Sequence, residues 1–244
     1  MPKVPKWMAN AMESLFSGSY HPVQVTAVED LASGLRKVCF EGDFSKSKKE
    51  FVAGNAIEFR INDTEFRHYT PSHFNQEAGV CEVWFYLHDK GPGSKWVIGL
   101  KPGQQLKLLG PGGKIKYDAK ASCHVAFGDE TSLGLFECLS AEARKQGHSF
   151  VGIAELDNAN RPWAKVPDGN VVSTPKNDQE KGSYAIVELN KWLQNQAPER
   201  ETIVFYLTGN AKSIVALKKS LLDQGFKSAQ IQTEPYWSEG KPGL

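Results

Sequence analysis

Short segments in which apolar and polar residues alternate fill residues 22–109 of the chain. A period of two is typical of half-buried β-strands. Glycine and proline residues separate the segments, as expected for tight turns, and predict a small antiparallel barrel of about six strands with one short helix near Ser94–Leu100. The alternating positions are Val23/Val25, Val38/Phe40, Ile57/Phe59/Ile61, Cys81/Val83/Phe85/Leu87 and Leu106/Leu108.

The pattern changes after residue 119 to strands that alternate with helices. Leu133, Phe136 and Leu139 form one stripe of the first of these helices. Such alternation predicts a doubly wound, mostly parallel sheet that binds ligands beyond the carboxyl ends of its strands. We therefore expect two domains, residues 1–119 and 120–244. The predicted elements of the second are strands Cys123–Phe127, Phe150–Leu156, Ile203–Leu207 and Gln230–Thr233, and helices Thr131–Gln146, Tyr184–Gln194 and Ala211–Leu222.

Composition narrows the function. The formal net charge of +1 gives no reason to expect a nucleic acid or an anionic membrane as partner. Residues 1–16 lack the continuous apolar core of a signal peptide, and no stretch reaches the ~18 apolar residues of a membrane span. We expect a cytoplasmic monomer without stable membrane association. The four widely spaced cysteines predict reduced, mostly buried thiols and no metal cluster.

The segment Arg67–Thr70 carries the first candidate chemistry. On a strand, Arg67 and Tyr69 point to one face and His68 and Thr70 to the other, and we expect Pro71 to end regular pairing. Arginine can bind phosphate oxygens and tyrosine can pack on a flavin ring, so the segment could hold FAD. Taken alone, the same residues also fit a solvated cross-strand pair.

A glycine-rich turn follows at His88–Trp96. It leads from a strand into the short helix, and free backbone N–H groups there can face an anion. Ser94 is also a good N-cap residue, so a capped helix without a ligand is the alternative. His88 fits a hydrogen-bonded edge residue better than a catalyst.

The third segment, Phe127–Ser132, lies at the carboxyl end of the first strand of the second domain. Doubly wound sheets bind ligands at this place. The glycine fingerprint of dinucleotide sites is absent, and Asp129 or Thr131 could simply cap the helix.

The order of these segments resembles the siderophore-interacting protein family, the FAD-containing ferric-siderophore reductases of the ferredoxin reductase superfamily. The resemblance extends from about Val23 to Gly240. Its motifs are Arg67-x-Tyr69-Thr70, His88 with Gly91–Trp96, Gly110-Pro111-x-Gly113, Gly128–Leu133 and Tyr236-Trp237-x-x-Gly240.

The resemblance implies a role for each matching residue. Arg67 would meet the FAD pyrophosphate, Tyr69 the ribityl chain and ring, and Thr70 the surroundings of the flavin N5 atom. Asp129, Glu130 and Thr131 would face the nicotinamide. The cofactor-binding set is Arg67, His68, Tyr69, Thr70, His88, Gly93, Ser94, Trp96, Asp129, Thr131, Tyr236 and Trp237.

The chain departs from the family at three places. Relatives often have a basic residue where this chain has Ser72 and another where it has Ser238, and an Ala-Gly-Glu turn where it has Thr208–Asn210. The first two departures affect the expected siderophore contacts and favour a hydroxamate over a strongly anionic catecholate. The electron donor stays open among NADH, NADPH and reduced ferredoxin.

The implied reaction needs no catalytic acid or nucleophile. Ferrous iron is held less tightly than ferric iron by hard oxygen donors, so reduction would release it. Two alternatives share these features: a ferredoxin, flavodoxin or free-flavin reductase, and a non-catalytic siderophore-binding protein. The lysines that could steer the siderophore are Lys48, Lys49, Lys114, Lys116 and Lys241, each of which also fits a plain solvated lysine.

Overall fold

The computed structural model divides the chain into two compact units, one ending at Gly113 and the other beginning at Lys114. The boundary between the two units lies in the segment before Cys123, a few residues ahead of the domain boundary expected near residue 119. The structure describes residues 3–15, 19–47, 49–88, 91–196 and 199–240. Within these ranges, no helix is both long enough and apolar enough to cross a membrane.

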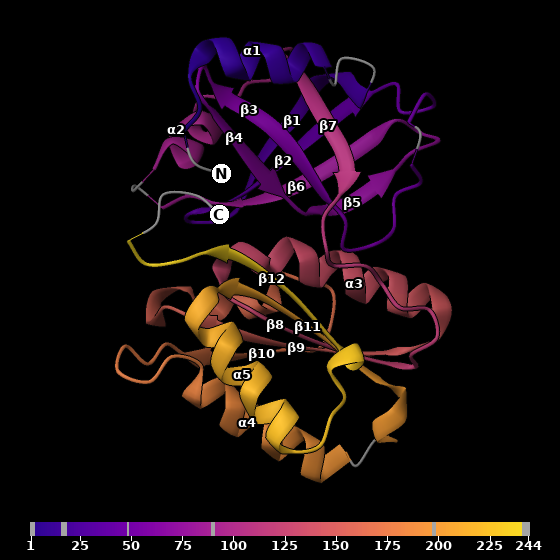
Figure 1. Ribbon diagram of the computed structural model, residues 1–244, viewed down its shortest axis with the longest axis vertical. Helices are drawn as coiled ribbons and strands as arrows, with labels where there is room; N and C mark the ends of the chain where they lie inside the picture. Colours follow the sequence, from indigo (N-terminus) through magenta and orange to yellow (C-terminus); the bar gives the residue numbers. More distant parts are fainter. Residues whose placement is uncertain (1–2, 16–18, 48, 89–90, 197–198, 241–244) are drawn as a thin grey trace. The chain divides into compact units, whose positions relative to one another are not determined.

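In the part of the first unit that the structure describes, a seven-stranded antiparallel sheet is accompanied by two helices (Figure 1). Its strands follow the order β4-β3-β7-β1-β2-β6-β5. Its elements are α1 (Lys6–Leu15), β1 (Tyr20–Ala32), β2 (Leu35–Gly42), β3 (Ala56–Asn62), β4 (Glu65–Tyr69), β5 (Pro71–Asn75), β6 (Val80–Tyr86), α2 (Pro92–Ile98) and β7 (Gln105–Gly112).

The sheet is closed into a barrel at Thr70. Strands β4 and β5 lie at opposite ends of the strand order, yet a single residue joins them, so the two edges of the sheet must meet there. The predicted barrel is confirmed with one strand more than expected. Our expectation that Pro71 ends pairing was wrong, because Pro71 opposes Val83 and begins β5. Strand β4 pairs with β3, and strand β5 pairs with β6. We call the place at Thr70 where the two edges meet the barrel seam.

The alternating apolar positions of the first unit point into the barrel. Val25, Val38, Phe40 and Val83 are fully buried and belong to one core cluster. Helix α1, which the period-two pattern did not predict, is fixed outside the strands by polar contacts. Arg60 on β3 donates to Glu13 at 2.6 Å.

The second unit contains a five-stranded parallel sheet in the order β10-β9-β8-β11-β12. Its elements are β8 (Cys123–Gly128), η2 (Glu130–Ser132), α3 (Leu133–Gln146), β9 (Ser149–Leu156), η3 (Asn158–Lys165), β10 (Val171–Pro175), α4 (Ser183–Gln196), η4 (Arg200–Thr202), β11 (Ile203–Asn210), α5 (Ala211–Asp223), η5 (Ser228–Gln230) and β12 (Ile231–Trp237).

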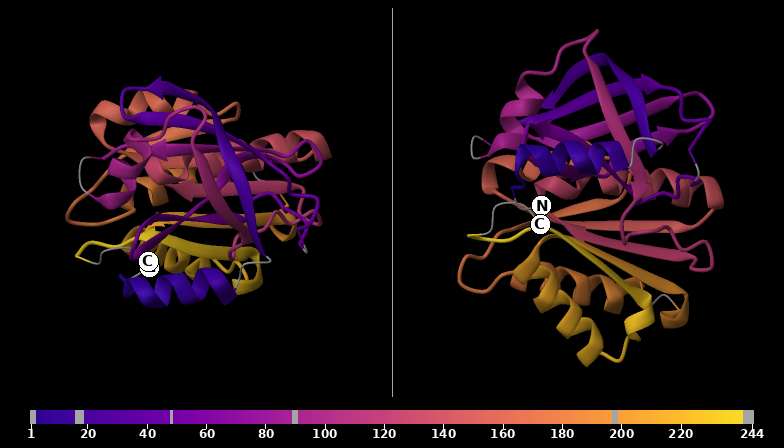
Figure 2. Two further views of the ribbon diagram at one scale, coloured as in Figure 1. Left: turned by 90° about the horizontal axis from the view of Figure 1, so that it is seen from above. Right: turned by 45° about the horizontal axis from the view of Figure 1, so that its top comes forward.

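Helices cover both faces of this sheet, as the doubly wound prediction requires. Helix α3 lies on one face, and α4 and α5 lie together on the other (Figures 1 and 2). The predicted stripe of Leu133, Phe136 and Leu139 is fully buried. The sequence analysis missed strand β10, which forms one edge of the sheet and has Thr174 as its one buried residue. The chain connections reverse direction between β8 and β11, so the ligand-binding edge of such a fold lies at their carboxyl ends.

A stack of four rings joins the amino ends of β8 and β11 to the segment before them. His124 Nε2 lies 3.1 Å from the carbonyl of Ala121, which can only accept, so Nε2 carries the proton of the neutral ring. Nδ1 then accepts from the Tyr206 hydroxyl at 3.0 Å, and the same hydroxyl oxygen accepts from the backbone N–H of Asp118 at 3.0 Å. His148 and Tyr117, whose hydroxyl lies 2.8 Å from His148 Nδ1, complete the stack.

The four cysteines are free thiols, as predicted. Cys81, Cys123 and Cys138 are buried, and Cys39 is half-buried. Burial raises the pKa of both Cys39 and Cys123, so these thiols stay protonated at neutral pH.

Candidate functional site

The barrel seam brings Arg67, Tyr69 and Gly93 together. A Cβ atom added at Gly93 would lie 3.0 Å from Tyr69 Oη and 3.9 Å from Arg67 Cγ. Residue 93 must therefore be small for α2 to approach this face of β4 so closely. The alternation predicted that Arg67 and Tyr69 share a face, and the turn at Gly93 does lie against that face.

The Arg67 guanidinium is held by neighbours on its own strand. It donates to Glu65 Oε1 at 3.0 Å and to the carbonyl of Phe66 at 2.8 Å. Burial raises the pKa of Glu65, but hydrogen bonds from Asn62 and Arg67 outweigh burial and leave this pKa below its ordinary value. Glu65 is therefore a carboxylate that fixes Arg67. The guanidinium has more N–H donors than these two contacts use, so it can also bind a ligand.

Tyr69 rests on an aromatic cluster at the edge of the barrel core. Its ring is nearly parallel to that of Trp96, at 16° with 6.2 Å between centroids, and meets Phe85 edge-on at 4.7 Å. Burial raises the pKa of Tyr69 far above the neutral range, so its hydroxyl stays a donor. Trp96 thus packs against both Tyr69 and Phe59.

His68 and Thr70 have different surroundings from Arg67 and Tyr69. The half-exposed ring of His68 points away from Arg67, and its Nε2 lies 3.0 Å from Glu58 Oε2. Thr70 is half-buried and is the one residue between β4 and β5.

The turn before α2 differs from its predicted form in one respect. Ser94 is not the N-cap, because the helix begins at Pro92 after Gly91. Ser94 is instead buried within the helix, and its hydroxyl accepts from the backbone N–H of His88 at 3.2 Å. The Ser94 hydroxyl therefore links His88 to the helix. The centroid of the His88 ring lies 5.5 Å from that of the Tyr86 ring.

In the second unit, Asp129 lies at the carboxyl end of β8 and is almost fully buried. One carboxylate oxygen accepts from the backbone N–H of Thr131 at 2.9 Å and from its hydroxyl at 2.5 Å. The other oxygen accepts from Trp237 Nε1 at 2.6 Å. Gly209, at φ +87°, leaves the space that this carboxylate fills, since a Cβ there would lie 2.5 Å from Asp129 Oδ2. The structure therefore joins Asp129, Thr131 and Trp237, and Tyr236 precedes them half-buried on β12.

A second charged cluster lies next to Asp129. Glu130, whose side chain is 1% exposed, binds Lys176 Nζ at 2.8 Å and accepts from Asn160 and from the backbone N–H of Asp157. Lys176 also lies 3.1 Å from Asp157 Oδ2. The sequence analysis missed Asp157 and Lys176. Asp157 directly follows the predicted strand Phe150–Leu156, which was an available signal, whereas Lys176 follows β10, which was not predicted.

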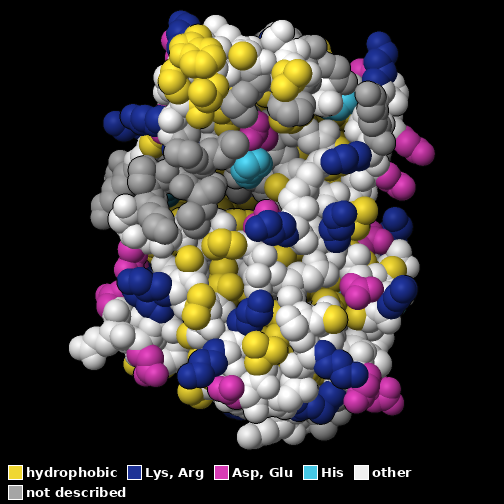
Figure 3. All heavy atoms as spheres, in the orientation of Figure 1, with side chains coloured by type: hydrophobic (Ala, Val, Ile, Leu, Met, Phe, Trp, Pro, Cys, Tyr) yellow, Lys and Arg dark blue, Asp and Glu magenta, His cyan; other side chains and the backbone are white. Residues whose placement is uncertain are grey.

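The candidate siderophore-steering lysines that the structure describes belong to different units. Lys49 is exposed in the first unit, and Lys114 and Lys116 are exposed in the second. Lys48 and Lys241 lie outside the described residues. On the face shown in Figure 3, basic and acidic side chains are scattered among uncharged ones.

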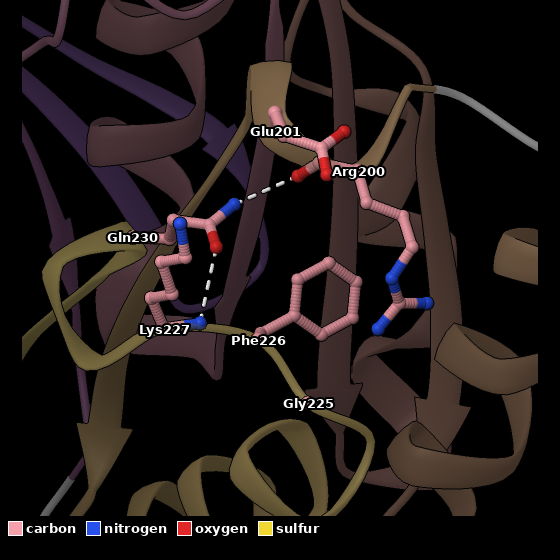
Figure 4. Close-up of a pocket in the computed structure, with 6 residues that line it drawn as sticks. All are labelled: Arg200, Glu201, Gly225, Phe226, Lys227 and Gln230. Carbon is pink, nitrogen blue, oxygen red and sulfur yellow. Dashed lines mark hydrogen bonds between the residues drawn. The ribbon is translucent and has the colours of Figure 1, made fainter.

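A small hollow of about 150 Å³ lies at the amino ends of β11 and β12, away from the ligand-binding edge. The guanidinium of Arg200 covers the Phe226 ring at 3.9 Å, and Gln230 donates to the carbonyl of Arg200 at 2.7 Å (Figure 4). The hollow is too small for a dinucleotide, and the polar groups of Gln230 and Arg200 that line it already bond to each other. The lining residues are Arg200, Glu201, Gly225, Phe226, Lys227 and Gln230.

Comparison with known families matches both units. Residues 59–115 match the siderophore-interacting FAD-binding domain, and residues 121–240 match the siderophore-interacting protein model.

Two curated relatives are similar over most of the chain. The ferric vibriobactin reductase ViuB of Vibrio cholerae is 24% identical over 179 residues, or 72% of this chain. The NADPH-dependent ferric-chelate reductase of Escherichia coli is 22% identical over 175 residues, or 70% of this chain. The matched region spans 65% of the length of each relative.

Solved structures share the fold. The siderophore-interacting protein SipS from Aeromonas hydrophila superposes with a TM-score of 0.70 at 19% identity, covering 91% of this chain and 93% of SipS. The ferredoxin reductase in carbazole 1,9a-dioxygenase gives a TM-score of 0.72 at 18% identity, covering 90% of this chain and 70% of that protein. The barrel followed by a parallel sheet is thus the fold of both groups.

Proposed function

Because the chain belongs to the siderophore-interacting protein family, we propose that it is an FAD-dependent reductase that releases iron from ferric siderophores. The convergence of Arg67, Tyr69 and Gly93 at the barrel seam carries this proposal. The names of the two reductase relatives support it.

The seam residues fit FAD in their chemistry. Arg67 has donors for the pyrophosphate, and Glu65 orients its guanidinium without using all of them. Tyr69 offers a hydroxyl and a ring fixed by Trp96, which suits the ribityl chain and the ring system. The narrow space at Gly93 lets the backbone of the turn come close to the same ligand. Bound FAD would supply the means of taking two electrons from a donor and passing them on singly.

The protein's own contribution is binding and orientation. No acid, base or nucleophile is assigned, because electron transfer to ferric iron forms no covalent bond to the protein. The second unit would receive the electron donor at the carboxyl ends of β8 and β11, where Asp129 holds Thr131 and Trp237 in place. NADH, NADPH and reduced ferredoxin are the candidate donors.

We propose a hydroxamate as the siderophore class. The position after the Thr-Pro pair, where relatives often have a basic residue, is here Ser72. Its side chain is buried and donates to the carbonyl of Glu82 at 3.2 Å. Without a cation there or at Ser238, a strongly anionic catecholate complex would lack neutralisation.

The proposal is tested with purified protein under anaerobic conditions. The FAD-loaded protein is reduced chemically with dithionite and then mixed with a ferric trihydroxamate, and a ferrous-specific chelator reports the released iron. We expect flavin absorbance to disappear on reduction and to return as ferrous iron forms. With a ferric triscatecholate in place of the trihydroxamate, we expect flavin absorbance to return and ferrous iron to form more slowly.

Three results would contradict the proposal. Protein that takes up no FAD excludes a flavoenzyme. Reduced flavin that stays reduced with the siderophore, yet transfers electrons to ferredoxin or free flavin, favours a reductase with another acceptor. Siderophore binding without any flavin favours the non-catalytic binding protein.

A further inference from the structure

The carboxyl ends of β9 and β10 place an acidic and a basic residue face to face. The two strands pair in parallel with Leu156 opposite Pro175, so Asp157 and Lys176 are the first residues beyond them. Their side chains meet, with 3.1 Å between Lys176 Nζ and Asp157 Oδ2. Both residues therefore lie on the edge where a doubly wound sheet binds a nucleotide.

The charge of Lys176 is already neutralised by the protein. Its Nζ lies 2.8 Å from Glu130 Oε2, and the Glu130 side chain is almost fully buried, so this partner cannot turn away into solvent. The three side chains of Lys176, Glu130 and Asp157 together carry one positive and two negative charges. A phosphate group arriving here would meet a net negative cluster.

Lys176 stays protonated in this cluster. Burial acts to lower its pKa, but the hydrogen bond to Glu130 and the charges of Glu130, Asp129 and Asp157 outweigh burial and raise the pKa above its ordinary value. The ammonium group is thus a fixed partner of the carboxylates.

Asp157 is the member of the cluster that a ligand can reach. Its side chain is 52% exposed, whereas those of Lys176 and Glu130 are 23% and 1% exposed. A carboxylate at this position can accept hydrogen bonds from both hydroxyls of a ribose.

We propose that Asp157 is a specificity-determining residue that makes this chain select NADH over NADPH as its electron donor. Its carboxylate accepts from the adenosine ribose hydroxyls of NADH and repels the 2′-phosphate of NADPH. This inference rests on the proposed function and narrows its donor. A preference for NADH would distinguish this chain from the Escherichia coli relative, which is named as an NADPH-dependent reductase.

Arg161 is the neighbouring cation that could oppose this selection. Its exposed guanidinium donates to Ser173 on β10, at 3.4 Å to the hydroxyl and 3.3 Å to the carbonyl. These contacts hold Arg161 along the edge strand, but an NADPH-selective protein would use such a residue to bind the 2′-phosphate. An Arg161 variant therefore distinguishes the two possibilities.

The experiment measures binding of the oxidised nucleotides, which transfer no electrons. NAD⁺ and NADP⁺ are titrated calorimetrically into the FAD-loaded protein, and the ratio of their dissociation constants is compared among variants. We expect NAD⁺ to bind about tenfold more tightly than NADP⁺. In Asp157→Asn the ratio is expected to fall to about threefold or less, mainly because NADP⁺ binds better.

Two control variants sharpen the result. Asp178→Asn removes another exposed carboxylate with a lysine partner, Lys181 at 2.8 Å, and should leave the ratio unchanged. Arg161→Ala should leave it unchanged as well. Equal binding of both nucleotides to the unmodified protein, an unchanged ratio in Asp157→Asn, or a selective loss of NADP⁺ affinity in Arg161→Ala would overturn the inference.

Absence of binding by either nucleotide also overturns this inference, and it points to a protein donor such as ferredoxin. The proposed function would still be judged separately, because the dithionite experiment needs no nucleotide. A protein that fails the dithionite test but binds NAD⁺ selectively would fail the proposed function alone.

Discussion

The barrel seam and the carboxyl edge of the parallel sheet carry similar kinds of residues but use them differently. At the seam, Arg67 keeps donors beyond its contacts with Glu65 and Phe66, and a Cβ atom at Gly93 would lie only 3.0 Å from the Tyr69 hydroxyl. At the sheet edge, Asp129 and Glu130 are almost fully buried and accept from the protein's own N–H and O–H groups. The polar groups of Arg67 therefore remain available to a ligand, whereas Asp129 and Glu130 are engaged by the protein itself.

This difference predicts where substitutions take effect. Changes at the seam should reduce flavin content with little loss of stability. Changes in the polar networks of the second unit should reduce stability with little effect on flavin content.

The largest effect is expected for Arg67→Ala. Under the proposed function, loss of the guanidinium would remove charge-assisted hydrogen bonds to the FAD pyrophosphate, each of which is worth about 1.5–3 kcal/mol. We expect FAD affinity to fall by about 100-fold, measured by fluorescence titration of the unloaded protein. The circular dichroism spectrum should be unchanged.

Arg36→Ala is the matched control for this variant. Arg36 is also an arginine of the barrel with a carboxylate partner, Asp30 at 2.7 Å, but it lies on the β1–β2 hairpin. It should retain full FAD affinity. Stoichiometric flavin in purified Arg67→Ala would remove Arg67 from the site.

The next effect is a loss of stability in acid that originates at His124. Burial, the largest cause, and the nearby His148 lower the pKa of His124 to about 4, although the Ala121 carbonyl and Asp118 oppose them. Because the folded state has the lower pKa, stabilisation is complete above the unfolded value of about 6.5 and is lost as the pH falls toward about 4. We expect the free energy of unfolding to drop by about 1.5 kcal/mol between pH 7 and 5.

His124→Phe separates this contribution from other titrating groups. It keeps a ring in the stack with Tyr117, Tyr206 and His148, lowers stability overall, and should flatten the pH dependence measured by urea unfolding. His73→Gln, which removes an exposed histidine of the barrel, should leave the slope as it was. An unchanged slope in His124→Phe would assign the pH dependence elsewhere.

A smaller effect is expected from the contact between Trp237 and Asp129. Trp237→Phe keeps an aromatic ring but removes the N–H donor that lies 2.6 Å from the carboxylate. Losing a hydrogen bond to a charged group should lower the free energy of unfolding of the second unit by about 1 kcal/mol or more.

A double-mutant cycle isolates this contact. Trp237→Phe should cost little in the background of Asp129→Ala, giving a coupling energy of about 1 kcal/mol by urea unfolding. Additive losses would show that the bond contributes nothing to stability.

The sequence predicted the architecture well where local patterns decide it. Period-two alternation located the core strands of the barrel, and the stripe of Leu133, Phe136 and Leu139 located α3. Strand β10 was not predicted, because an edge strand with one buried residue has little apolar pattern. The sequence also did not predict that the chain divides into β4 and β5 at Thr70, because barrel closure depends on pairing between distant strands.

Site residues were predictable as neighbours but not as contacts. The pattern placed Arg67 and Tyr69 on one face, while their approach to Gly93 depends on how α2 packs. Ser94 was expected to cap that helix, yet its hydroxyl binds His88, because Pro92 already begins the helix after Gly91. Lys176 and Asp157 become significant only because β9 and β10 are neighbours, which the chain order does not reveal.

The smallest effect is expected for Gly93→Ala, and it tests the seam by shape alone. The added Cβ would lie 3.0 Å from Tyr69 Oη, so the hydroxyl or the helix must shift by a few tenths of an ångström. We expect FAD to bind about threefold more weakly, with the free energy of unfolding changed by less than about 0.5 kcal/mol. Gly112→Ala adds the same methyl group in the same unit, where nothing lies within 4 Å, and should bind FAD normally. Equal FAD affinities for the two variants would mean that close packing at residue 93 does not contribute to holding the flavin.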